Sequence, residues 1–405
     1  MYKIIFGLTT MSFLGQGIAL SLLFIITRYF SQSDFGEYGY IISIAGLISF
    51  AISFRMDSFI VRLSDTRLKV MLLPIIIIIL FFCVILFLVL AFFKSIAYSF
   101  TLTSIVFFTF YINVMSVYVS RYGLFKKLAI SRLLKPVSTS VIQAFLGYFT
   151  VVNGLIYGGL MGTLVPSLYF SNLMHRSDLI NLQRKFKITL YVLIKMKREI
   201  CLISAQSIVS NVFNNSLLFY FYLKGDLLSA GLIALLERCL KNPISMIASS
   251  IRNYSYSKID DKNNQFTSYK TIITLSVLLA ITISFCALIF FHLGMFSYLL
   301  SEQWVVSEID FTFYLLFSAI VLCNSVNSPF ILKNKLTKTI IRLDMFCVLF
   351  ITIFFFVDHL YLSGEWNFFV VFFGLYFTYF LLNCYFVIKS MDHLSVSHNL
   401  KVSGK

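Results

Sequence analysis

The chain has 405 residues, of which 59% are hydrophobic and only 12% are charged. Soluble domains carry about 25% charged residues, so a water-soluble globular fold is excluded, because so few polar side chains could not cover its surface. The charge balance is basic, with 33 Lys and Arg against 17 Asp and Glu. Such an excess can serve nucleic-acid binding, so the positions of the basic residues decide what it means.

Twelve stretches are long and apolar enough to cross a bilayer as α-helices, which takes about 20 residues each. The uncharged run 136–174 has 39 residues, too many for one crossing, and Asn153-Gly154 supplies a turn that divides it. We therefore predict an all-α, polytopic membrane protein of about twelve helices in two six-helix bundles. The first run is longer than the core of a signal peptide, so we expect it to be retained as a span. The expected spans are 4–27, 38–60, 70–92, 96–119, 132–151, 154–174, 200–222, 228–251, 271–292, 311–331, 343–361 and 366–388.

The basic residues fix the orientation of these helices. With the N-terminus in the cytoplasm, 27 of the 33 basic residues fall in cytoplasmic segments, three lie at the opposite side and three lie within spans. Cytoplasmic loops of membrane proteins carry such an excess of Lys and Arg. Both termini are therefore expected in the cytoplasm, and the net charge of +16 needs no nucleic acid to explain it. Arg28, at the outer end of the first span, is interpreted as an anchor that snorkels to the interface.

One connection is far more polar than the others. The segment 176–199 carries seven Lys and Arg and separates six expected helices from six. We predict an N-terminal bundle at 1–175, a basic cytoplasmic linker at 176–199 and a C-terminal bundle with a short cytoplasmic tail at 200–405. This layout is typical of transporters built from two repeated halves.

The first helix of each half carries a stripe of polar side chains on one face. Such side chains either hold helices together by hydrogen bonds or line a wet cavity. For the first span both interpretations stay open, and for the span 200–222 the sequence favours the cavity because the stripe is longer. The stripe of the first span consists of Thr9, Ser12 and Gln16. The second consists of Ser204, Ser207, Asn211 and Asn214, followed by Asn215.

Three charges stand near the middle of the span 228–251, namely Glu237, Arg238 and Lys241. A charge at this depth costs about 2.5–3.5 kcal/mol on insertion scales. Glu237 and Lys241 have the spacing and order of an ion pair along one helix. Arg238 either forms an ion pair with another helix or faces an internal cavity that receives an anionic substrate. We favour the second, since ionisable residues in spans mark functional sites.

Two further charges lie on the expected helix 38–60. Arg55 either snorkels to the interface or contributes to a site. Asp57 is too short to reach the interface, so it either pairs with a basic residue or takes part in proton coupling. Glu237 is the second candidate for ion coupling. Asn324 and Asn327 are interpreted as polar contacts between helices.

Motifs of metal, cofactor and catalytic sites are missing from the sequence. The seven cysteines form no CxxC pair, the five histidines are scattered, and no P-loop occurs. Neither a metal site, a cofactor nor a nucleophilic catalytic set is indicated. The sequence therefore predicts a transporter rather than an enzyme.

Three stretches carry a family resemblance: Ser31–Tyr38, continued by Arg55–Arg62; Arg238 with Asn242-Pro243; and Leu300–Trp304. They resemble the polysaccharide-transporter branch of the multidrug/oligosaccharidyl-lipid/polysaccharide (MOP) exporter superfamily, typified by the Wzx-type O-antigen flippases. The family usually has a small residue in place of Arg55 and a glycine in place of Ser301. The resemblance implies two bundles around a central, often cationic, cavity that opens to alternate sides.

The implied activity is translocation of undecaprenyl-pyrophosphate-linked oligosaccharide from the cytoplasmic to the periplasmic leaflet of a bacterial inner membrane. Candidate partners are the O-antigen polymerase and the chain-length regulator. Two alternatives stay open: a membrane-embedded polymerase or glycosyltransferase, and a multidrug exporter of the same superfamily. In the favoured interpretation Arg238 and Lys241 hold the pyrophosphate. The residues expected to contact the sugars are Gln16, Ser207, Asn211 and Asn214.

The predicted orientation can be tested with reporter fusions. Fusions after Lys187 and after Lys262 should report a cytoplasmic location, and a fusion beside Trp304 a periplasmic one, because of the distribution of Lys and Arg. Alkaline phosphatase and green fluorescent protein give opposite signals on the two sides. Export of the Lys187 fusion would show that the twelve-helix topology is wrong.

Overall fold

The computed structural model describes residues 2–53, 65–172, 182–258, 265–301, 303–333, 336–361 and 365–403. These residues are helical apart from short connections, and none of them lies in a strand. The predicted all-α class is confirmed. Arg55 and Asp57 lie outside the described residues, so the predictions made for them stay predictions.

The chain forms two compact units, 1–234 and 235–405. The helices of the first unit are α1 (Tyr2–Tyr29), α2 (Gln32–Ser53), α4 (Asp65–Phe93), α5 (Ile96–Arg121), α6 (Phe125–Tyr148), α7 (Gly154–Ser171), α8 (Leu182–Lys195), α9 (Lys197–Asn214), α10 (Ser216–Leu223) and most of α11 (Leu227–Leu236). The second unit holds the π-helical turn η2 (Glu237–Lys241), α12 (Asn242–Lys258), α13 (Gln265–His292), α14 (Met295–Leu299), α15 (Glu308–Asn324), α16 (Asn327–Lys333), α17 (Thr337–Tyr361) and α18 (Glu365–Ser403).

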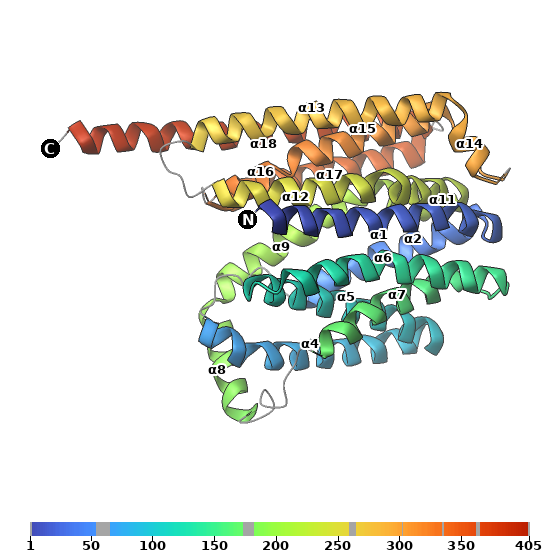
Figure 1. Cartoon of the computed structure of the whole chain (residues 1–405), viewed down its shortest axis with the longest axis horizontal. Helices are drawn as coiled ribbons and strands as arrows, with labels where there is room; N and C mark the ends of the chain where they lie inside the picture. Colours follow the sequence, from blue (N-terminus) through green and yellow to red (C-terminus); the bar gives the residue numbers. More distant parts are fainter. Residues whose placement is uncertain are drawn as a thin grey trace. The chain divides into compact units, whose positions relative to one another are not determined.

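Each of the twelve expected spans overlaps described helices in this succession (Figure 1). Nine correspond to one helix each, and three are interrupted: 200–222 is α9 with α10, 228–251 is α11 with η2 and α12, and 311–331 is α15 with α16. Among the described residues, seven helices are by themselves long and apolar enough to cross a membrane. The seven include the interrupted span Glu308–Ile331, whereas α6, α7, α17 and the interrupted spans 200–222 and 228–251 are not among them.

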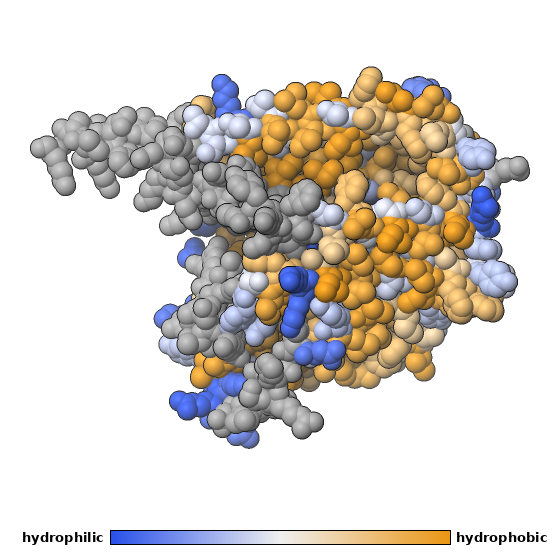
Figure 2. All heavy atoms as spheres, in the orientation of Figure 1, coloured by the Kyte–Doolittle hydropathy of each residue, from blue (hydrophilic) through white to orange (hydrophobic). Residues whose placement is uncertain are grey.

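Many of the solvent-accessible side chains on the helices are large and apolar. On α4, Phe81, Leu88 and Phe92 are 62%, 62% and 84% exposed. Figure 2 shows that the visible face of the molecule is largely hydrophobic. Soluble monomers rarely expose large apolar patches, whereas such a surface suits contact with lipid. The chain is therefore a multi-pass membrane protein.

The boundary between the compact units does not coincide with the predicted linker at 176–199. That segment contains α8, which packs on α4, and the next helix, α9, packs on α2 within the same unit. Tyr40 of α2 stacks on Tyr222 of α10, with ring centroids 3.5 Å apart. These contacts extend the first unit to residue 234. The functional division into six-helix bundles at 1–175 and 200–405 stays a prediction.

The connection between α1 and α2 is closed by a capping box. The Ser31 N–H and hydroxyl donate to Asp34 Oδ2 at 2.9 and 2.7 Å, and the Asp34 N–H donates to Ser31 Oγ at 3.3 Å. These bonds satisfy polar groups that the start of α2 leaves free. The part of the family-like stretch that begins at Ser31 thus has a structural role.

Close helix packing in the first unit depends on glycines of α7. α6 packs along both α1 and α7 (Figure 1). Gly154, Gly158 and Gly162 follow one another at intervals of four residues, so they share one face of α7. A Cβ at Gly158 would lie 2.3 Å from Gln143 Cγ, and one at Gly162 would lie 1.9 Å from Thr139 Oγ1. Small residues at such spacing let two membrane helices approach closely.

We expect Gly162→Ala to destabilise the protein, since the added methyl group would also lie 2.7 Å from the Thr139 Cα. Overpacking of this kind typically costs about 1–3 kcal/mol. The measurement is the apparent melting temperature of the detergent-purified protein. Gly17→Ala in α1 is the matched control, because no atom lies within 4 Å of a Cβ placed there. Equal melting temperatures for the two variants would contradict the close contact between α6 and α7.

Candidate functional site

The charges predicted for the eighth span lie in a π-helical turn. The N–H of Asn242 donates to the carbonyl of Glu237, five residues earlier, whereas an α-helix joins residues four apart. The turn η2 comprises Glu237 to Lys241 and therefore holds all three charges; we call it the charged turn. π-Helical turns within membrane and soluble helices are frequently found at functional sites.

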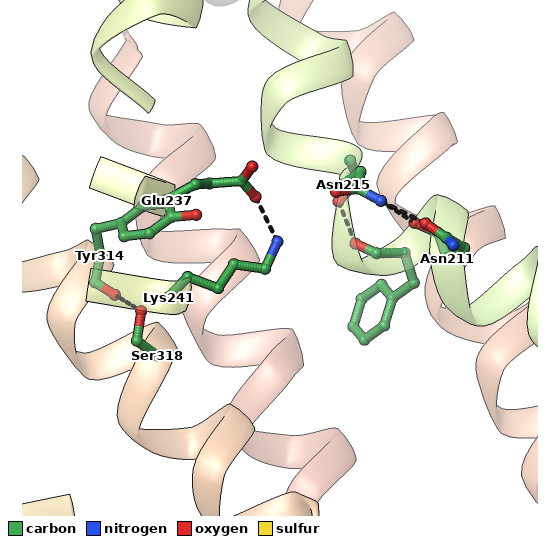
Figure 3. A network of polar contacts seen from close by, with 8 residues as sticks. Asn211, Asn215, Glu237, Lys241, Tyr314 and Ser318 are labelled. Carbon is green, nitrogen blue, oxygen red and sulfur yellow. Dashed lines mark hydrogen bonds and ion pairs between the residues drawn. The ribbon is translucent and has the colours of Figure 1, made fainter. Parts of the chain in front are cut away.

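Within the charged turn, Lys241 Nζ forms an ion pair with Glu237 Oε1. The two side chains are only 18% and 20% exposed. The Lys241 ammonium also lies 5.8 Å from the centroid of the Phe317 ring of α15, and Tyr314 of the same helix lies beside Glu237 (Figure 3). The predicted pairing of residues 237 and 241 is confirmed, and it explains how two charges are accommodated in an apolar helix.

Arg238 is the third charge of this turn and is partly buried. Since Glu237 and Lys241 offset each other, the turn has a net charge of +1. A cation held among apolar helices attracts an anion much more strongly than one in water. Arg238 therefore stays the leading candidate for contact with an anionic substrate, while Lys241 is engaged with Glu237 in this structure.

The polar residues expected on one face of the seventh span divide into separate contacts. Asn215 Nδ2 donates to Asn211 Oδ1 at 2.5 Å and to the Asn211 carbonyl at 2.9 Å (Figure 3). The helix is interrupted at Asn215, between α9 and α10. Ser207 donates to the Ile203 carbonyl at 2.9 Å, and Asn214 lies 3.5 Å from the Ser210 hydroxyl. Asn211 thus bonds to Asn215 rather than to Ser207 or Asn214, although all of them are half-buried.

On α1, the stripe is described for two of its three members. Ser12 is buried, and its hydroxyl has no hydrogen-bond partner within the described part of the chain. Gln16 is half-buried, and the side chain of Thr9 lies outside the described part. Arg28 is exposed at the end of α1, a position that suits the predicted anchor.

Buried polar contacts join four helices of the second unit. The Tyr269 hydroxyl of α13 donates to Asn327 Oδ1 at 2.7 Å, and Asn327 Nδ2 donates to Asn324 Oδ1 at 3.1 Å. Asn383 Nδ2 of α18 donates to the same Asn324 oxygen at 3.2 Å. The interpretation of Asn324 and Asn327 as contacts between helices is confirmed. We call these four residues the polar chain.

One buried charge was missed by the sequence analysis. Asp344 of α17 is 0% exposed, and neither of its carboxylate oxygens has a hydrogen-bond partner among the described residues. It stands at the edge of the expected span 343–361, beside the basic residues of a loop that is predicted to be cytoplasmic. The available signal was an aspartate directly before the apolar run 345–357, but its position near a loop suggested solvent exposure.

The described residues hold no group of three or more His, Cys, Asp or Glu side chains that could bind a metal ion. The structure thus gives two separate groups of candidate residues: the charged turn in the second unit and the amides of α9 in the first. These groups can bind phosphate oxygens and sugar hydroxyls.

The chain matches no family model, and the search of characterised protein sequences gave no match. Solved structures of the MOP superfamily are similar over almost the whole chain. A transporter from Pyrococcus furiosus, described by the reverse polarity of its binding pocket, shares 14% identity at a TM-score of 0.63, covering 97% of this chain and 96% of that one. The outward-facing form of a multidrug resistance MATE transporter shares 14% identity at a TM-score of 0.61 and covers 96% of both chains. Its inward-facing counterpart shares 15% identity at a TM-score of 0.56, covering 95% and 96%. At this identity the similarity shows that the chain has the fold of MOP superfamily transporters.

The polar face of α9 can be tested by cysteine accessibility. In a background without native cysteines, single cysteines at 207, 211 and 214 should react with a small water-soluble thiol reagent, since these half-buried positions are expected to line a wet cavity. A cysteine at 204 is the matched control on the same helix, because Ser204 is 5% exposed and bonds to the Ile200 carbonyl. If 207, 211 and 214 were as protected as 204, the face would be packed dry.

Proposed function

We propose that this protein is a flippase that moves undecaprenyl-pyrophosphate-linked oligosaccharide from the cytoplasmic to the periplasmic leaflet of a bacterial inner membrane. The fold of MOP superfamily transporters supports a transport role, and alternating access is the way in which such two-part transporters expose a site to each side. The choice of an anionic substrate rests on the net positive charge of the charged turn, which is partly buried.

The chemistry of a lipid-linked pyrophosphate suits this turn. The pyrophosphate brings at least two negative charges into an apolar region, where they need fixed cations or helix dipoles. A guanidinium can donate two parallel hydrogen bonds to one phosphate group, which assigns the anchoring role to Arg238. Lys241 can exchange Glu237 for the phosphate when substrate arrives. The amides of Asn211 and Asn214, with Ser207 and Gln16, supply donors and acceptors for sugar hydroxyls.

A multidrug exporter is the second candidate, since MATE transporters share the fold. Exporters of cationic drugs need an acidic or aromatic site, because a cation is repelled by a fixed positive charge. The description of the Pyrococcus furiosus transporter ties a different function to the polarity of its pocket. By the same reasoning, a positive turn in this chain favours an anionic substrate.

A polymerase or glycosyltransferase is the third candidate. Such an enzyme is expected to hold its catalytic groups in a long extracytoplasmic loop. The longest outer connection lies at about 293–310, and α14 and the start of α15 occupy much of it. A transporter accounts for this short connection better.

Transport can be measured with purified protein in lipid vesicles. A fluorescent polyprenyl-pyrophosphate-linked oligosaccharide should cross the bilayer. Its movement is measured by chemical quenching of the label that is exposed in the outer leaflet. Arg238→Ala should abolish the movement, and Arg238→Lys should keep part of it, because a point charge still attracts phosphate without the paired hydrogen bonds. Arg252→Ala is the matched control, since Arg252 is exposed on α12, directly after the expected span 228–251.

Each outcome of this experiment bears on one part of the proposal. Normal movement by Arg238→Ala at equal protein abundance would show that the cationic-site idea is wrong, while the flippase function would stand. Transport of tetraphenylphosphonium, a lipophilic cation, without movement of the pyrophosphate lipid would instead identify a multidrug exporter.

A further inference from the structure

Asp344 is the buried charge that the proposed transport site does not use. It lies seven residues after the start of α17 at Thr337, about 10 Å along the helix axis. α17 packs on α18 and on α16. With 0% exposure and no hydrogen bond of normal geometry to either carboxylate oxygen within the described part of the chain, an ionised side chain would be buried without a charged partner among the described residues.

A carboxylate in such surroundings is expected to carry a proton. Burial of an ionised carboxylate without a partner is so costly that the group takes up a proton instead. Metal cations are bound through several oxygen ligands at once. Here the phenol of Tyr379 lies next to the carboxylate, outside normal hydrogen-bond geometry. One proton satisfies Asp344 where a metal ion would need more ligands.

The groups around Asp344 carry no compensating positive charge among the described side chains. Tyr376 and Tyr379 face it from α18, and Cys347 follows three residues later on α17. The described side chains of α16 are uncharged, and the side chain of Lys333 at the end of that helix lies outside the described part. Lys338 and Arg342 of α17 itself are exposed, and so do not offset a buried negative charge.

The polar chain leads from this carboxylate toward the cytoplasmic end of the unit. On α18, Tyr379 stands one turn before Asn383. The Asn383 side chain donates to Asn324 Oδ1 at 3.2 Å. The chain continues through Asn327 to Tyr269, four residues after the start of α13 at Gln265. In the predicted orientation, this end of α13 faces the cytoplasm. The polar groups thus mark a route by which water can reach Asp344 when α17 and α18 separate.

We propose that Asp344 is a proton-binding site that exchanges with the cytoplasm along the polar chain, and that its protonation is coupled to transport. The coupling part of this inference rests on the proposed transport function. The packed arrangement of α17 on α18 holds the protonated form, and separation of the two helices exposes the carboxyl group to water, where it ionises. A proton therefore favours one conformation over the other, because it binds them with different affinity.

The proton-binding site can be tested without any transport substrate. Dicyclohexylcarbodiimide is an apolar reagent that reacts with protonated carboxylic acids. Incubation of the full-length protein in detergent should label the peptide that contains Asp344, as identified by mass spectrometry, and labelling should fall as the pH rises. Asp344→Asn should lose this label. Asp226→Asn is the matched control, since Asp226 accepts the Ser229 N–H at the start of α11 and asparagine caps a helix equally well.

The test does not depend on the folding of Asp344→Asn, because the labelling of the Asp344 peptide is measured on the unmutated protein. Absence of label at Asp344 across the pH range would overturn the site. Labelling that does not change with pH would overturn proton exchange. Protection of Asp344 by sodium chloride, but not by potassium or choline chloride, would show that the carboxylate binds a metal cation instead.

Coupling requires a second measurement in vesicles with the fluorescent pyrophosphate lipid. A pH gradient should change the initial rate of movement for the unmutated protein and not for Asp344→Asn. If the lipid moves but no gradient affects its rate, coupling is wrong and the flippase function stands. If Asp344 binds a proton but the lipid does not move, the proposed substrate is wrong and the proton site stands.

Discussion

Charged side chains in apolar helices must be satisfied by the protein, because lipid offers them no partner. Glu237 and Lys241 meet this constraint by pairing within one turn, where each is about one-fifth exposed. Their pairing leaves the turn with one net positive charge, from Arg238. In our proposal Asp344 meets the same constraint differently, since a carboxylate becomes neutral by taking up a proton, whereas an arginine does not lose its proton in proteins. The two candidate functions, anion binding and proton binding, follow from this difference in chemistry.

The helix carrying the charged turn is irregular where the charges lie. In a π-helical turn the backbone widens by one residue, and here Asn242 bonds to Glu237. Similar breaks occur at Asn215 and between α15 and α16. Irregular backbone at membrane depth is tolerated where it is buried in protein or lines a water-filled cavity. Regular helices such as α4 instead present apolar side chains on their exposed flank. Irregularity and polar side chains thus occur together along this chain.

The fold shared with MOP superfamily transporters has retained little sequence similarity to the solved examples. Such a fold tolerates divergence because much of its surface only needs to be apolar, as the exposed phenylalanines of α4 illustrate. Close contacts are stricter, and Gly158 and Gly162 show where any larger residue would collide with α6. The substrate is set by a few side chains on this scaffold, so fold similarity alone leaves it open.

The sequence by itself determined the number, order and approximate limits of the spans, because hydropathy depends only on local composition. It also predicted the ion pair of Glu237 and Lys241, since four residues along a helix bring two side chains together whatever surrounds them. Only the tertiary structure decided which polar residues are buried and what they contact. Asn211 bonds to Asn215 because the helix breaks there, and α9 joins the first unit because it packs on α2. Asp344 looks like a loop-side aspartate in the sequence, yet the packing of α17 against α18 removes it from water, and no local pattern encodes contacts between distant segments.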